Sequence, residues 1–72
     1  MNDSVYKIIE LIGTSSESWE KAAVNAIDTA ARTLRDLRIA EVTAMDLVIE
    51  EGKVVAFRSK VKLSFKYHSE ED

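Results

Sequence analysis

Residues 16–37 read SESWEKAAVNAIDTAARTLRDL, and their pattern predicts a single long amphipathic helix. Apolar side chains recur at intervals of three and four residues, the spacing that places them on one face of an α-helix. Because most of them are alanine, which is small and favours helix, this face can pack closely on a sheet. Thr14 and Glu17 have the spacing of a capping box, so we expect the helix to begin near Ser16. The apolar face comprises Trp19, Ala22, Ala23, Ala26, Ala30 and Leu34, with Ile27 and Leu37 beside it.

The segment before the helix, residues 4–12, reads SVYKIIELI and ends at Gly13. Its β-branched and aromatic side chains are typical of a strand that runs into a turn. Both faces of this strand are largely apolar, and one helix can cover only one of them, so we expect a neighbouring subunit to cover the other. The two faces carry Val5, Ile9 and Leu11 on one side and Tyr6, Ile8 and Ile12 on the other.

After the helix, residues 38–50 and 54–67 flank Glu51 and Gly52, a tight-turn pair that predicts an antiparallel hairpin. Apolar residues alternate with cations along the second of these strands, as in a half-buried strand. We therefore predict an α+β fold with a β-α-β-β chain. Its three-stranded antiparallel sheet would have the order 1-3-2 and pack on one long helix. Residues 1–72 are expected to form a single domain.

A two-residue turn would place Glu50 opposite Lys53, which fixes the register of the hairpin. In this register Glu41 pairs with Lys62, Met45 with Arg58, Leu47 with Ala56 and Ile49 with Val54, all on the face away from the helix. That face would expose a contiguous apolar area, which on a small domain predicts an interface. The area consists of Ile39, Met45, Leu47, Ile49 and Val54.

Composition narrows the classes of function. A chain of 72 residues is close to the size at which one core is barely sufficient without disulfides, metal or oligomerisation. It has no cysteine, its start MNDS is not a signal peptide, and no apolar run approaches the roughly 18 residues of a membrane span. A net charge of −3 gives it no electrostatic reason to bind nucleic acid. We expect a cytoplasmic protein with no nucleic-acid or membrane partner.

The residues whose side chains could take part in catalysis do not form a catalytic set. The only histidine, His68, lies in the acidic tail 68–72, which we expect to be frayed, and no nucleophile accompanies it. We therefore do not expect an enzyme. Carboxylates are the side chains suited to a hard cation such as calcium, although a solvated acidic turn is the simpler interpretation. The candidate metal ligands are Glu17, Asp46, Glu50 and Glu51.

Two further features have a structural interpretation beside a functional one. Arg58, Lys60, Lys62 and Lys66 would be spaced about 7 Å apart along their strand, as a phosphate track would be. Glu41 opposes them and no aromatic residue lies among them, so an ion-paired sheet surface explains them better. Trp19 is suited to stacking on a ligand, but its place in the apolar stripe favours a core position.

Taken together, the sequence resembles the dodecin family over nearly its whole length. The resemblance rests on Tyr6-Lys7, Glu10, Gly13-Thr14-Ser15, Ala30, Thr33-Leu34-Arg35, Leu37, Ala40-Glu41-Val42, Val61, Leu63 and Phe65. It implies a β-α-β-β subunit that assembles with itself into a hollow homododecamer. It also implies a storage role, in which flavin (FMN or riboflavin) is sequestered rather than used in catalysis.

Two departures from the flavin-binding pattern predict that the flavin site is degenerate. The family's ring-stacking tryptophan, two residues before the Glu-Val pair, is replaced by Ile39, and its glutamine after the strand's aromatic residue is replaced by Arg58. The strings Ser18-Trp19-Glu20, Arg38-Ile39-Ala40 and Lys62-Leu63-Ser64-Phe65 are similar to the calcium dodecin branch, which implies an ion ligand instead. A shell with a purely structural role is the remaining alternative. The predicted cofactor-binding positions are Ile39, Arg58, Met45 and Glu41.

Overall fold

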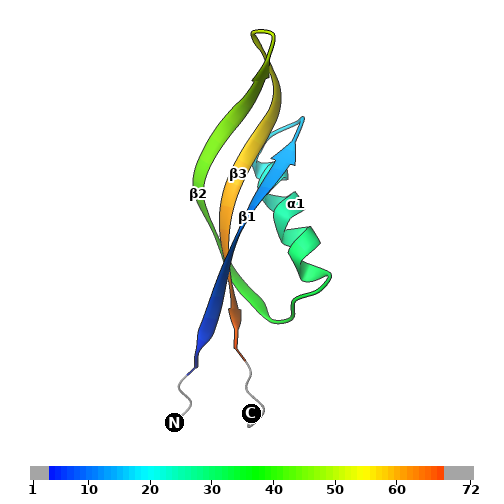
Figure 1. Cartoon of the computed structure of the whole chain (residues 1–72). Coiled ribbons are helices and arrows are strands. Elements are labelled where there is room, and N and C mark those ends of the chain that lie inside the picture. The colour runs from blue at the N-terminus through cyan, green and yellow to red at the C-terminus, as the bar shows by residue number, and fades with distance from the viewer. Residues whose placement is uncertain (1–3, 68–72) are drawn as a thin grey trace.

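The computed structural model describes residues 4–67 and has the predicted β-α-β-β order (Figure 1). The elements are β1 (Tyr6–Ser15), α1 (Trp19–Ala31), β2 (Leu37–Glu50) and β3 (Lys53–Lys66). The three strands form one antiparallel sheet with the order β1-β3-β2, and α1 lies along one face of it. The predicted fold class is confirmed.

The helix is shorter than predicted at both ends. Its N-cap is Ser18, whose hydroxyl accepts a hydrogen bond from the backbone N–H of Lys21 at 3.0 Å, so the capping box from Thr14 to Glu17 is wrong. Residues 15–17 instead form a turn in which Ser15 Oγ accepts from the Glu17 N–H at 2.9 Å. At the other end the helix stops at Ala31, and the chain reverses direction through Asp36, whose φ of 60° is left-handed.

Gly13 lies inside β1, which continues to Ser15 instead of ending in the predicted turn. It is buried where the helix comes closest to the sheet, and a Cβ built there would clash with the backbone carbonyl of Ala22. The side chain of Asn25 fastens the same region by donating to the carbonyl of Thr14 at 2.9 Å. The glycine therefore serves close packing of helix on strand.

Gly13→Ala is expected to lower the free energy of unfolding by roughly 1–3 kcal/mol, because the added methyl group forces the helix away from the sheet. Urea denaturation followed by circular dichroism measures the effect. Gly52→Asn is the matched control: nothing lies within 4 Å of its Cβ position, and asparagine tolerates its φ of +77°. Equal stability of the Gly13→Ala and wild-type proteins would contradict the close-packing role.

The core is a thin layer between α1 and the sheet. Its buried apolar side chains are Ala22, Ala26, Ala30, Val61 and Leu63. Ser59 is completely buried among them, and its hydroxyl donates to the backbone carbonyl of Trp19 at 2.8 Å. The one polar residue on the helix-facing side of β3 is thus satisfied by the first turn of the helix.

The register of the hairpin is as predicted at both ends but not between them. Glu50 lies opposite Lys53, Ile49 opposite Val54, and Glu41 opposite Lys62, as expected. Residues 44–48 are shifted by one position, so that they lie opposite residues 56–60. The shifted part is bounded by one extra residue on each strand, Thr43 on β2 and Val55 on β3, so the predicted pairs return beyond it. A third irregularity lies between Leu37 and Ile39, at the start of β2.

This shift moves four apolar side chains that were predicted on the helix-free face to the other face of the sheet: Met45, Leu47, Ile49 and Val54. Met45 lies opposite the helix-facing Ser59, and Leu47 lies opposite Phe57, so the predicted pairs with Arg58 and Ala56 are wrong. Met45 is 59% and Leu47 is 40% exposed because α1 packs mainly on β1 and β3. The chain therefore exposes apolar surface on both faces. On the helix-free side this surface includes Tyr6, Ile8, Ile12 and Ile39.

The described chain is long and thin, with principal extents of 55 × 20 × 14 Å and a radius of gyration of 15.1 Å. A compact chain of this length would have a radius of about 11 Å. No helix among residues 4–67 is long and apolar enough to cross a membrane. The shape explains why so few side chains are buried in a single copy.

Candidate functional site

The candidate surface is the helix-free face of the sheet, where β3 presents a row of cations between its two neighbours. Lys62 lies between Glu10 of β1 and Glu41 of β2. The opposite-charge pair with Glu41 is as predicted, and Glu10 adds a second acidic neighbour. Lys60 lies between the uncharged residues Ile12 and Ala44. Acidic residues therefore flank Lys62 but not Lys60, and the row of cations is not a uniformly basic track.

Arg58 and Asp46 form a two-fold hydrogen-bonded ion pair on this face. Arg58 Nε donates to Asp46 Oδ1 and Arg58 Nη2 donates to Asp46 Oδ2, both at 2.7 Å. This hydrogen bonding lowers the pKa of the Asp46 carboxyl and raises the pKa of the Arg58 guanidinium. The pair is present at neutral pH and is lost only when the pH falls through the lowered pKa of Asp46. Both side chains are about half exposed to solvent, so the pair contributes little to the free energy of unfolding. Its main effect is on the local distribution of charge.

The four predicted cofactor positions do not come together in one copy. Ile39 is 65% exposed on the helix-free face, and Arg58, opposite Asp46, lies seven residues along the hairpin from it. This separation is about 23 Å, too far for both to contact one ring system. Glu41 lies on the same face, opposite Lys62, whereas Met45 lies on the helix-facing side.

The four predicted metal ligands are also dispersed. Asp46 has both carboxylate oxygens bonded to Arg58, Glu50 and Glu51 lie at the tip of the hairpin, and Glu17 lies between β1 and α1. Within residues 4–67, no three Asp, Glu or His side chains gather closely enough to hold an ion. His68 and the rest of the acidic tail lie outside the described residues. A single copy therefore presents no assembled metal centre in its described part.

Trp19 lies at the rim of the core and joins the helix to the hairpin. Its indole N–H donates to the backbone carbonyl of Asp46 at 3.0 Å, and its ring meets the Phe57 ring edge-on, with centroids 5.1 Å apart and planes at 79°. With 37% of its surface exposed, Trp19 is packed less deeply than its place in the helical stripe predicts. It holds the start of α1 against the register-shifted part of β2.

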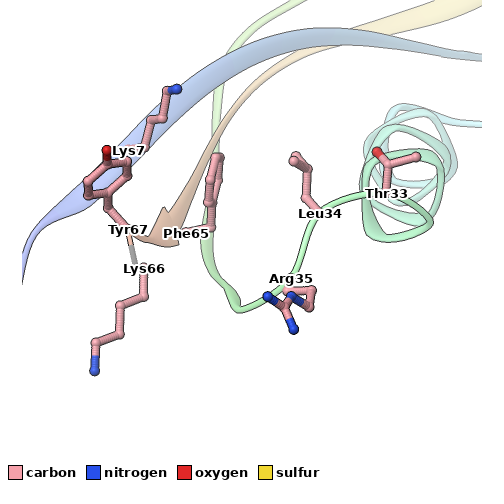
Figure 2. Close-up of a pocket in the computed structure, with 7 residues that line it drawn as sticks. All are labelled: Lys7, Thr33, Leu34, Arg35, Phe65, Lys66 and Tyr67. Atoms are coloured by element: carbon pink, nitrogen blue, oxygen red, sulfur yellow. The ribbon is translucent and has the colours of Figure 1, made fainter. Parts of the chain in front are cut away.

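A crevice that the sequence interpretation missed opens where the helix ends, with a volume of about 260 Å³. Figure 2 shows the ring of Phe65 facing Leu34 across it, with Lys7 and Arg35 on different sides and Lys66 directed away. The sequence held one signal for this crevice, Lys7: it lies on the same, helix-facing side of β1 as Ile9 and Leu11, yet it is charged. We call this feature the Phe65 crevice, lined by Lys7, Thr33, Leu34, Arg35, Phe65, Lys66 and Tyr67.

Comparison with known proteins assigns the chain to a class of small β-α-β-β proteins. The dodecin family model matches residues 5–68 of the chain. The chain therefore belongs to the dodecin family.

Three similarities illustrate this relationship. The calcium dodecin of Mycobacterium tuberculosis is 41% identical over 63 residues, which are 88% of this chain and 89% of that protein. The structure of dodecin from Streptomyces coelicolor superposes with a TM-score of 0.89 at 35% identity, covering 96% of this chain and 99% of that one. The crystal structure of the M. tuberculosis calcium dodecin, described as calcium-chelating with a novel calcium-binding site, gives 0.81 at 40% identity over 96% and 99% of the two chains.

Proposed function

We propose that this chain assembles into a hollow homododecameric shell that binds and stores a small ligand in the cytoplasm and is not an enzyme. The observation that supports assembly is apolar surface on both faces of a thin sheet. Ile8 is 60% and Ile39 is 65% exposed on the helix-free face, and Met45 is 59% exposed on the other. A second copy that covers these side chains would supply the hydrophobic burial that a single thin layer lacks.

The ligand surface of this shell differs from a flavin site at the two positions that the family resemblance assigns to the ring. Ile39 offers no aromatic face for stacking, and Arg58 is a cation already bonded to Asp46 instead of a neutral amide. Because these positions lie about 23 Å apart in one copy, a ring that contacts both would lie between subunits. We propose that this site exists only in the assembly and binds flavin weakly.

Calcium is the second candidate ligand, favoured by the 41% identity with a calcium dodecin. Calcium takes six to eight oxygen ligands, and the carboxylates of Glu17, Asp46, Glu50 and Glu51 are dispersed in one copy. A complete shell of ligands would therefore combine carboxylates from several subunits with water. In this version of the proposal, calcium binding depends on assembly.

Native mass spectrometry of the purified protein is expected to show a species of about twelve times the 8.1 kDa chain mass, because the single copy has too little core. Calorimetric titration of chelator-treated protein with calcium, and with magnesium as the control, then tests the ion. A stable monomer at micromolar concentration would contradict the shell. Absence of heat with millimolar calcium, in protein that is still assembled, would contradict the calcium version alone.

A further inference from the structure

The end of the β2–β3 hairpin projects beyond the rest of the sheet (Figure 1). The last pair between β1 and β3 joins Ser15 to Phe57, so residues 48–56 form an arm of only two strands. Ile49 is 63%, Val54 is 50% and Val55 is 43% exposed along it. Since an isolated two-stranded hairpin is marginal in water, this arm needs a partner. We call residues 48–56 the hairpin arm.

The tip of the hairpin arm is acidic. Glu50 and Glu51 outnumber the one cation there, Lys53, which lies opposite Glu50. The turn is closed by Glu51 and Gly52 with φ values of 51° and 77°. Glu51 and Gly52 are therefore held in left-handed conformations that present the carboxylates at the end of a narrow ribbon. Neither glutamate forms an ion pair with another side chain of residues 4–67.

The Phe65 crevice offers the complementary chemistry at the other end of the molecule. Its walls are the apolar side chains of Leu34 and Phe65, and the cations Lys7 and Arg35 stand at its rim (Figure 2). Both cations also lack an ion-pair partner in the described part of the chain. At about 260 Å³ the crevice is smaller than the roughly 300–1,000 Å³ of a typical small-molecule pocket, so it suits a few side chains better than a cofactor.

We propose that the hairpin arm of one copy inserts into the Phe65 crevice of a second copy. Glu50 and Glu51 then lie beside Lys7 and Arg35, and the apolar side chains of the arm cover Phe65. A chain cannot make this contact with itself, because the arm and the crevice are at opposite ends of a molecule 55 Å long. The inference rests on the proposed self-assembly and names one of its contacts.

The contact is head-to-tail, since different surfaces of the two copies meet. Head-to-tail contacts build closed rings when the rotation between copies closes, which a shell of identical subunits requires. A second copy fits the crevice because the two surfaces are complementary. The hairpin arm is apolar and ends in two carboxylates, whereas the crevice has an apolar wall and two cations. Charge matching of this kind mainly fixes which surfaces meet and in which orientation.

Charge reversal tests the contact. Glu50→Lys with Glu51→Lys, and separately Lys7→Glu with Arg35→Glu, are each expected to reduce the assembled fraction at least tenfold in size-exclusion chromatography with light scattering at low salt. The four substitutions combined in one chain are expected to restore assembly, because the charges again oppose. Glu20→Lys with Asp28→Lys makes the same change in net charge as the reversal of Glu50 and Glu51, at exposed positions of α1, and is the matched control for it.

Cross-linking keeps the test decisive if a charge-reversed chain fails to fold. Glu51→Cys with Arg35→Cys, treated with a short bis-maleimide, is expected to give a ladder of covalent dimers and larger species on a denaturing gel, because each contact joins two different copies. Glu51→Cys with Asp28→Cys is the control. Uncross-linked monomer from an assembled protein would overturn the contact while leaving assembly intact. A monomeric wild type would overturn both.

Discussion

Ile39→Trp together with Arg58→Gln is expected to tighten riboflavin binding by at least about tenfold, or some 1.4 kcal/mol. The tryptophan adds stacking of roughly 0.5–1.5 kcal/mol beyond the area that it buries. The glutamine replaces a cation with a neutral amide that both donates and accepts hydrogen bonds. Titration of riboflavin fluorescence measures the affinity. The neutral riboflavin is the appropriate probe, because Arg58→Gln leaves the carboxylate of Asp46 without its bidentate partner and a flavin phosphate would be repelled.

The single substitutions separate the two contributions. If the ring lies between subunits, Ile39→Trp alone gives part of the gain, and Arg58→Lys in the tryptophan background gives no further gain because the charge remains. Native mass spectrometry of each variant must show the wild-type oligomer for the comparison to hold. Submicromolar riboflavin affinity of the wild type, or no gain in an assembled double mutant, would show that Ile39 and Arg58 do not determine flavin binding.

Leu63→Ala is expected to lower the free energy of unfolding by roughly 2–5 kcal/mol, because it removes most of the largest fully buried side chain among residues 4–67. The total free energy of unfolding of a small domain is only about 5 kcal/mol or somewhat more. The neighbouring alanines of α1 are too small to fill the cavity that the substitution leaves. The variant should therefore unfold at temperatures where the wild type is folded. Thermal melts followed by circular dichroism at two protein concentrations measure this.

Leu63→Met is the volume-conserving control and should lower the free energy of unfolding by less than about 1.5 kcal/mol. If assembly supplies most of the stability, the melting temperature of both variants and of the wild type should rise with protein concentration. A melt of Leu63→Ala that coincides with the wild type would mean that the layer between α1 and β3 contributes little.

The sequence predicted the fold because the main patterns agree with one another. The Glu51-Gly52 turn sets the hairpin, the alternation along β3 sets its faces, and the alanine stripe sets the helix. The predicted end of the helix was wrong, although the prediction that Leu34 and Leu37 pack on the core is confirmed. Leu34 lies in the connection between α1 and β2, and Leu37 is the first residue of β2. Helical spacing alone cannot distinguish these cases, because the same side chains reach the core either way.

The register shift of residues 44–48 had no signal in the sequence. The irregularities that bound it cancel, so the pairs on either side of it, from Ile39 to Val42 and at Ile49 and Glu50, are those of a regular ladder. The shift decides the candidate site, since it places Asp46 opposite Arg58 and turns Met45 to the other face. The replaced flavin positions were predicted from the family resemblance, whereas the ion pair between Arg58 and Asp46 depends on a pairing that only the structure reveals.

The bond from the Trp19 indole to the Asp46 carbonyl gives the protein a natural optical probe. Trp19 is the only tryptophan in the chain, so all indole emission comes from the point where the helix meets the register-shifted strand. The same residue of β2 that accepts the indole hydrogen bond holds Arg58 through its side chain. An ion that draws the Asp46 carboxylate away from Arg58 would alter the surroundings of the indole, and the emission spectrum of the unlabelled protein would record that change in real time.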